Sequence, residues 1–305
     1  VGRDRGGVAA VLSKIKIPLH IVAIDTDRLF PPRLQQEIAE LAAVLNADDP
    51  LTASMAEKVK GRVAYFSMSP DNPIIHDHIR RGGMAAIYEN GYLSILEGEW
   101  TLRIEEAVNI PVTMQGMAPF MIANALAACL ATFVQGIDIE LIRQGVRTFK
   151  PSVAQTPGRM NLFDLGHHHA LIDYAHNPAG YEAVGGFVGN WSGEKVGVVG
   201  GPGDRRDDDL ILLGKLSAQM FDRIIVKEDN DTRGRRRGEV ADLILRGISQ
   251  ENASLRPEVI LDETEALEKA LSTVSEGGLV VIFPESVTQS IDLIEKHRPL
   301  TDNQG

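Results

Sequence analysis

Cysteine is almost absent from this sequence, with Cys129 the single example among 305 residues. One cysteine excludes an internal disulfide framework and a cysteine-based zinc cluster, and it fits a reducing compartment, so we expect a cytoplasmic location. Long apolar runs are missing too. No stretch approaches the ~18 apolar residues that would cross a membrane, and residues 1–7 hold no apolar signal core. The chain starts with valine rather than methionine, which suggests a fragment or a processed chain.

Positive charge is also in short supply. Lysine and arginine number 31 against 42 aspartates and glutamates, which gives a formal net charge of -11. Binding to a nucleic-acid backbone needs a basic surface, so we expect no nucleic-acid partner. An acidic balance suits a cationic substrate, although it is also a common means of keeping a protein soluble.

Two phosphate-binding motifs are absent as well. No G-x-x-x-x-G-K-[ST] sequence occurs anywhere, so the chain has no P-loop. The stretch Val196–Asp207 is a strand-like run that leads into a glycine-rich loop, but Arg206 stands where the dinucleotide fingerprint has its third glycine. Glycines there still allow backbone N–H groups to approach an anion at the start of a helix.

The remaining sequence predicts an α/β fold in two domains, residues 1–150 and 151–305. Proline and glycine near residues 150–158 mark the boundary, because a strand and helix alternation restarts after them. In the second domain we expect a mostly parallel, doubly wound sheet, with strands at 160–164, 169–173, 196–200, 223–227, 259–261 and 279–283. In the first we expect strands at 17–24, 42–46 and 63–66, a meander over 85–104, and helices near 32–41, 51–59, 119–133 and 139–149.

One apolar run, Ala170–Pro178, ends in polar residues and proline. It predicts a buried parallel strand whose exit loop presents Asp173, His176 and Asn177. Ligands of open α/β sheets bind at the carboxyl ends of such strands. The alternative is an ordinary turn in which Asp or Asn caps the next helix.

Three other segments carry polar side chains that suggest chemistry. The run Ile225–Glu239 ends a predicted strand with carboxylates and then arginines. The carboxylates suit a guanidinium and the arginines an anion, although a solvated charged loop is the alternative. Arg159 follows Pro-Gly at the domain joint and could reach a phosphate, or be an ordinary linker residue. His167–His169 favours a hairpin tip over a metal site, because no second set of ligands accompanies it.

These segments together resemble a known family. Asn124–Ala128, Pro157–Arg159 and Asp173–Pro178, in this order and spacing, are similar to the second half of the Mur ligases. Asn46–Pro50 and Lys227–Arg235 narrow the resemblance to the Mur-ligase-like part of the cyanophycin synthetase family, over about residues 42–300. The resemblance implies ATP-dependent amide formation through an acyl phosphate, with Mg²⁺, in which arginine is added to the aspartate side chains of a polyaspartate or cyanophycin primer.

The same resemblance implies residue roles, although it assigns no catalytic residue and leaves homo-oligomer formation open. The nucleotide would contact Asn124 at the adenine, Arg159 at the phosphates, Asp173 at the ribose, and His176 and Asn177 at its edge. The incoming amino acid would face Asp204, Glu228, Asp229, Asp231 and Arg233.

Residues 1–42 depart from that family, whose P-loop and magnesium ligands would precede residue 42. They resemble the late part of homoserine O-acetyltransferase, with Asp27 as the triad acid, but the chain lacks a G-x-S-x-G nucleophile elbow. We therefore expect a chimera with an incomplete central domain and impaired ligase activity. The alternatives are a non-catalytic fragment that binds nucleotide or amino acid and, as a third choice, an acetyltransferase.

Overall fold

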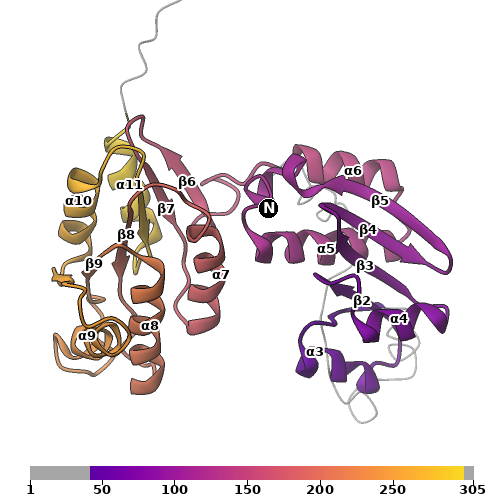
Figure 1. Ribbon diagram of the computed structural model, residues 1–305, viewed down its shortest axis with the longest axis horizontal. Helices are drawn as coiled ribbons and strands as arrows, with labels where there is room; N and C mark the ends of the chain where they lie inside the picture. The colour runs from indigo at the N-terminus through magenta and orange to yellow at the C-terminus, as the bar shows by residue number, and fades with distance from the viewer. Residues whose placement is uncertain (1–41, 299–305) are drawn as a thin grey trace, which may run out of the picture. The chain divides into compact units, whose positions relative to one another are not determined.

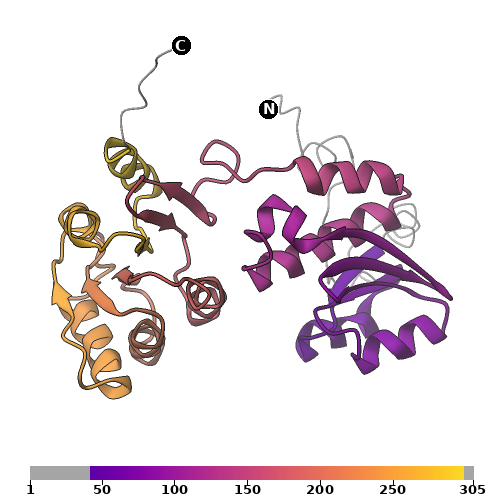
Figure 2. The ribbon, with the colours of Figure 1, turned by 45° about the horizontal axis from the view of Figure 1, so that its top comes forward.

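The computed structural model describes residues 42–298, which fall into two compact units that join between Lys150 and Pro151. Figures 1 and 2 show a sheet with helices packed on it in each unit. Among the described residues no helix is long and apolar enough to span a membrane. The strand predicted at 17–24 and the helix after it lie outside the described residues.

The first unit contains a five-stranded sheet in the order β1-β2-β3-β4-β5. Its strands are β1 (Ala42–Asn46), β2 (Arg62–Ser67), β3 (Met84–Glu89), β4 (Tyr92–Glu97) and β5 (Trp100–Glu106). β1, β2 and β3 are parallel, whereas β3, β4 and β5 form the predicted antiparallel meander. The β3–β4 turn is Asn90-Gly91, and both residues have positive φ (51° and 85°), as a two-residue hairpin loop requires.

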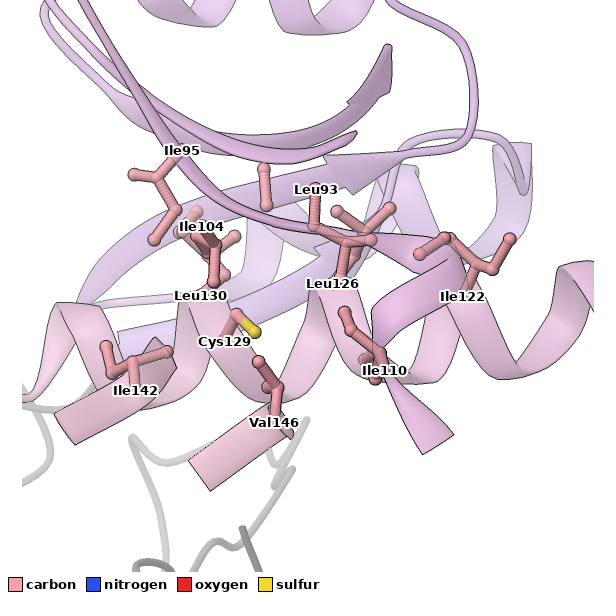
Figure 3. Close-up of a cluster of buried hydrophobic side chains, with 14 of the residues drawn as sticks. Leu93, Ile95, Ile104, Ile110, Ile122, Leu126, Cys129, Leu130, Ile142 and Val146 are labelled. Atoms are coloured by element: carbon pink, nitrogen blue, oxygen red, sulfur yellow. The ribbon is translucent and has the colours of Figure 1, made fainter. Parts of the chain in front are cut away.

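Helices cover both faces of this sheet. They are α3 (Pro50–Ser54), α4 (Pro73–Arg80), α5 (Pro119–Val134) and α6 (Ile139–Thr148), with short 3-10 turns at Met55–Lys58, Ala107–Asn109 and Pro111–Thr113. α5 packs on β1, β2 and β3, and its buried Leu126 and Leu130 point towards the strand residues Leu93 and Ile95 (Figure 3). α4 was not predicted from the sequence. Asn72 caps it by accepting the Ile74 N–H (2.9 Å), and Pro73 occupies its first turn, which are the local signals that mark its start.

A partly buried histidine in this unit should make its stability pH-dependent. The His78 ring meets the Tyr65 ring edge-on at 4.9 Å, and its Nε2 is buried without a hydrogen-bond partner. Burial holds the pKa of His78 below its usual value of 6.5, against the opposing hydrogen bonds to the backbone of Val63 and Met84. The neutral ring is therefore the form that the folded unit accommodates.

We expect this contribution of His78 to be present above about pH 6.5 and to be lost as the pH falls through the lower folded-state pKa, because the unfolded chain then binds the extra proton. Urea denaturation at pH 7.5 and pH 5.5 measures it. The fall in unfolding free energy between the two pH values should be smaller in His78→Gln than in the wild-type chain. Equal falls would contradict the assignment.

The second unit contains a six-stranded sheet in the order β10-β9-β8-β11-β7-β6. Its strands are β6 (Asn161–Asp164), β7 (His169–Ile172), β8 (Lys195–Val199), β9 (Arg223–Val226), β10 (Glu258–Val259) and β11 (Leu279–Ile282). All neighbours are parallel except β6, which pairs antiparallel with β7. The predicted mostly parallel α/β fold is therefore confirmed, and its strands lie at the predicted positions to within about two residues.

Helices follow most strands of this sheet. They are α7 (Pro178–Val188), α8 (Asp207–Met220), α9 (Glu239–Glu251), α10 (Glu263–Thr273) and α11 (Val287–Lys296). α7, α8 and α9 contact one another in chain order, and α10 contacts α11, so the sheet lies between two helical layers. β11 returns to the centre, between β8 and β7. The loops that leave β7, β8, β9 and β11 consequently emerge together at one edge of the sheet.

His167–His169 lies at the predicted β6–β7 hairpin tip. His167 is exposed, and the ring of His169 meets that of Trp191 edge-on at 4.9 Å. Within residues 42–298 no group of three or more His, Cys, Asp or Glu side chains is arranged to hold a metal ion.

Candidate functional site at the carboxyl edge of the second sheet

Asp173 directly follows β7 and is 6% exposed. Its N–H donates to the Ile282 carbonyl (3.2 Å), which extends the pairing with β11, and its Oδ2 accepts the Met160 N–H (3.0 Å). Burial raises the pKa of Asp173, while the Met160 N–H and the charge of Arg159 act in the opposite direction. A carboxylate held in this way, at the carboxyl end of a central strand, is oriented before any ligand arrives.

Arg159 lies next to this strand end, fourteen positions earlier in the chain. The loop that carries it turns at Gly158 (φ 70°), whose N–H donates to Asn161 Oδ1 (2.7 Å) and whose carbonyl accepts the Tyr174 N–H (2.8 Å). The guanidinium carbon of Arg159 lies 5.9 Å from the centre of the Tyr174 ring, and the side chain is exposed. The fold therefore places an exposed cation beside the buried carboxylate of Asp173.

His176 and Asn177 complete the β7 exit loop. His176 Nδ1 lies 3.0 Å from the Tyr174 carbonyl oxygen, and its ring centre lies 5.4 Å from that of Tyr174. Asn177 caps α7, because its Oδ1 accepts the Gly180 N–H (2.8 Å). The capped-turn alternative thus describes Asn177. Asn124, the fifth predicted nucleotide contact, is exposed on α5 in the first unit.

Arginine side chains connect the loops after β8 and β9 through hydrogen bonds and ion pairs. Arg235 donates to the carbonyls of Gly203 and Arg205 (both 2.7 Å) and pairs with Asp207 and Glu239. A Cβ on Gly203 would lie 2.1 Å from the Thr232 carbonyl oxygen, so only glycine permits this approach. Across the same contact, exposed Arg233 pairs with exposed Asp204 at 2.7 Å.

Arg237 and Glu228 are also used within the fold. Arg237 donates to the carbonyls of Asp229 (2.7 Å) and Leu261 (3.0 Å). Glu228 is 1% exposed, and its two oxygens accept the N–H groups of Gly238 (2.7 Å) and Val240 (3.0 Å) at the start of α9. Much of the charged run is therefore neither a solvated loop nor free for a ligand.

Two buried carboxylates and a buried lysine occupy the centre of this edge. Lys227 Nζ lies 2.7 Å from both Asp229 Oδ1 and Glu263 Oε2. Lys227 is 1% exposed and Asp229 8%. Burial opposes the charged form, but the carboxylates of Glu263 and Asp229 outweigh it and raise the pKa of Lys227. No role was predicted for Lys227 or Glu263, although a lysine directly after an apolar strand and before acidic residues is a signal that could have marked Lys227.

Of the predicted amino-acid contacts, the second unit brings Asp204, Asp229, Asp231 and Arg233 to this edge. Asp231 is exposed and its Oδ1 accepts the Arg233 N–H (2.9 Å). Carboxylates oriented at a strand end can accept the paired N–H groups of a guanidinium, or those of an ammonium group. The arrangement therefore suits a cationic ligand here and a nucleotide at the β7 end.

The Asn46–Pro50 motif in the first unit stabilises local structure. Asp48 Oδ2 accepts a hydrogen bond from the Met68 N–H (2.7 Å). Asp49 caps α3, because its Oδ1 accepts a hydrogen bond from the Leu51 N–H (3.0 Å). Both carboxylates thereby hold the chain at the ends of β1 and β2.

Comparison with known proteins shows what the chain is similar to. Residues 158–286 match the family model of the Mur ligase glutamate ligase domain. The chain carries a Mur ligase domain. It is 74% identical over 258 residues, 85% of its length, to cyanophycin synthetase of Crocosphaera subtropica, and 64% identical over 302 residues, 97% of its length, to that of Synechocystis. It spans about a third of those relatives, 30% and 34% of their lengths.

Two solved structures illustrate the similarity in fold. E. coli FolC in complex with DHPP and ADP matches 85% of this chain and 62% of its own, with a TM-score of 0.56 and 17% identity. MurF from Acinetobacter baumannii matches 85% of this chain and 52% of its own, with a TM-score of 0.54 and 18% identity. The Mur ligase fold extends in this way across both units.

The expectation of a chimera is not supported. Residues 1–42 lie mainly outside the described residues, but the alignment with the Synechocystis relative covers 97% of the chain and so extends into them. The resemblance of this segment to an acetyltransferase consequently gives no reason to assign it a separate origin.

Proposed function

We propose that this chain provides the nucleotide and amino-acid contacts of an ATP-dependent amide ligase of the cyanophycin synthetase type. The observation that carries this proposal is the 74% identity to a cyanophycin synthetase over 258 residues. The Mur ligase domain and the fold shared with FolC and MurF support the reaction class. The substrates proposed are ATP, arginine and a polyaspartate or cyanophycin primer.

The chemistry has two steps. An aspartate side-chain carboxylate of the primer attacks the γ-phosphorus of ATP, which forms an acyl phosphate and releases ADP. The α-amino group of arginine then attacks the acyl carbon, loses a proton, and expels inorganic phosphate to leave an amide. Enclosure between protein groups protects the acyl phosphate from water.

In this scheme the Asp173 carboxylate accepts hydrogen bonds from the ribose hydroxyls, and Arg159 faces the phosphates. His176 and Asn177 line the nucleotide beside them, and the adenine contact of Asn124 stays a prediction from the resemblance. Asp229, Asp231 and Asp204 receive the guanidinium or ammonium group of arginine, and Arg233 its carboxylate. Glu228, whose oxygens already accept two backbone N–H groups, holds the α9 start in position.

A divalent metal ion would balance the charge of the transferring phosphoryl group. Within the described residues no group of three or more His, Cys, Asp or Glu side chains is arranged for such an ion, and we assign no step of the reaction to Mg²⁺. Impaired ligation by the chain itself, expected from the missing P-loop motif, stays a prediction. An assay of ATP turnover with arginine and a polyaspartate primer tests it.

Replacing Asp173 by asparagine tests the nucleotide site. Asparagine keeps the size of the side chain and can still accept the Met160 N–H, but it loses the charge that ribose hydroxyls would bind. We expect the affinity for ATP, measured by calorimetry, to fall about tenfold, or about 1.4 kcal/mol. Asp292→Asn, at an exposed position on α11, is the matched control and should leave the affinity unchanged.

Equal ATP affinities in the Asp173→Asn and Asp292→Asn chains would contradict the nucleotide assignment. The missing P-loop favours a second candidate, a non-catalytic module that binds nucleotide or amino acid. Measurable ATP binding with no turnover in the presence of arginine and primer would support that candidate over the ligase.

A further inference from the structure

Lys227 is the centre of a buried ionic network with more negative than positive charge. Its ammonium group contacts two carboxylates, those of Asp229 and Glu263, both at 2.7 Å. A single ion pair would need only one of them. Removing charges from water costs several kcal/mol of free energy per ion. The third buried charge therefore adds a cost that a simple ion pair would avoid, which points to a further role.

The network connects three segments of the carboxyl edge in a ring of contacts: the loop after β9, the start of α10 and the loop after β11. Glu263, at the start of α10, accepts the N–H groups of Glu285 (2.5 Å) and Ser286 (3.1 Å) after β11. Glu285 in turn accepts the N–H groups of Asn230 (2.7 Å) and Asp231 (3.2 Å) after β9. The segment 229–231 is consequently held at both ends, by Lys227 directly and by Glu285 through Glu263.

The loop after β8 supports the same lysine from the other side. A Cβ on Gly200 would lie 2.7 Å from Lys227 Cε, and the Gly200 carbonyl accepts the Tyr181 hydroxyl (2.9 Å). The lysine side chain therefore runs against bare backbone. Even one added methyl group would have to displace it.

Asp229 leaves one of its oxygens uncommitted. Lys227 holds Oδ1, and within residues 42–298 no hydrogen-bond partner is found for Oδ2. The cations on neighbouring elements are themselves engaged, Arg237 with Glu228 and backbone carbonyls, and Arg233 with Asp204. The surplus negative charge of the network is thus available to a cationic group that approaches Asp229.

We propose that Lys227 is a positioning residue, which orients Asp229 and the segment 229–231 to bind the cationic amino acid that the ligase adds. This inference rests on the proposed function, and it assigns roles to Lys227, Glu263 and Glu285. Lys227 contacts no substrate. It fixes one oxygen of Asp229, so that the other points to the ligand with its rotational freedom already removed.

Two substitutions test the role while keeping the lysine. Gly200→Ala leaves every charge in place but displaces the Lys227 side chain. Glu263→Gln keeps the size of the side chain, retains an acceptor for one of the two N–H groups, and cancels the surplus charge. Gly186→Ala, at an exposed position in α7, is the control for the added methyl group.

Binding of L-arginine to the chain is measured by calorimetry, with L-citrulline as the uncharged ligand of the same shape. We expect Gly200→Ala and Glu263→Gln each to weaken arginine binding about tenfold and to leave ATP affinity unchanged. Citrulline should bind the wild-type chain at least tenfold more weakly than arginine. If the role of Lys227 were purely structural, the variants that still fold would show no selective loss of affinity for arginine.

Hydrogen exchange supplies a readout that needs no ligand. The amide protons of Asn230 and Asp231 should exchange at least tenfold faster in Gly200→Ala than in Gly186→Ala, whereas those of the α7 core should not change. Unchanged exchange in both variants, or unchanged arginine affinity, would overturn the role of Lys227. If the wild-type chain fails to bind arginine while exchange responds as expected, the proposed substrate is wrong but the positioning of segment 229–231 stands.

Discussion

Replacing Lys227 by methionine is expected to lower the free energy of unfolding of the second unit by about 3–5 kcal/mol. Methionine fills a similar volume, but it leaves the carboxylates of Asp229 and Glu263 buried without a cation, and these lie at 8% and 7% exposure. Urea denaturation of the full chain measures the change. Trp191 reports on the second unit when Trp100, the other tryptophan, is replaced by phenylalanine.

Lys195→Met is the matched control for that experiment. Its ammonium group lies 3.8 Å from Asp222 Oδ2, at a half-exposed site on the same sheet, and such pairs contribute about 0–1 kcal/mol. A triple variant, Lys227→Met/Asp229→Asn/Glu263→Gln, should recover part of the loss because no unpaired charge remains. A Lys227→Met chain as stable as Lys195→Met would show that the network carries little of the unit's stability.

A single methyl group at the contact between α8 and α9 should also lower the free energy of unfolding of the second unit. A Cβ on Gly247 would lie 2.0 Å from the Ile211 carbonyl oxygen and 3.0 Å from Gly214 Cα. Gly247→Ala must therefore push the two helices apart, and we expect it to cost about 1–3 kcal/mol in the same denaturation experiment.

The same chemical change at Gly186 should have the opposite sign. Gly186 lies in α7 and is exposed, so alanine there restricts the unfolded chain and favours the helix by up to about 1 kcal/mol. If Gly247→Ala and Gly186→Ala shift stability equally, the close approach of α8 and α9 does not limit the packing.

Much of the fold could be predicted from the sequence because its signals are local. The apolar runs that became β7, β8 and β11 are buried on both faces, which is typical of central parallel strands. The turn at Asn90-Gly91 follows from residues that tolerate positive φ. α4 was missed, although Asn72 and Pro73 marked its start, because its eight residues give only a short apolar pattern.

The candidate site was predictable only in part. Asp173 and Arg159 lie close together and Asn177 caps α7, but their roles toward a nucleotide stay predictions. The charge run after β9 could not be sorted by residue type alone. Glu228 and Asp229 are neighbours with the same chemistry, yet one accepts from the α9 start and the other from Lys227, because successive side chains of an extended chain point to opposite sides.

The sequence by itself determined the fold class and the loops that gather at the carboxyl edge, because apolar periodicity and turn residues act over a few positions. Only the tertiary structure decided which charges are buried, paired or free. Glu263 lies 36 positions from Lys227, and Glu285 lies 55 positions from Asn230. Contacts of that range depend on the order of strands in the sheet, which brings β11 back between β7 and β8.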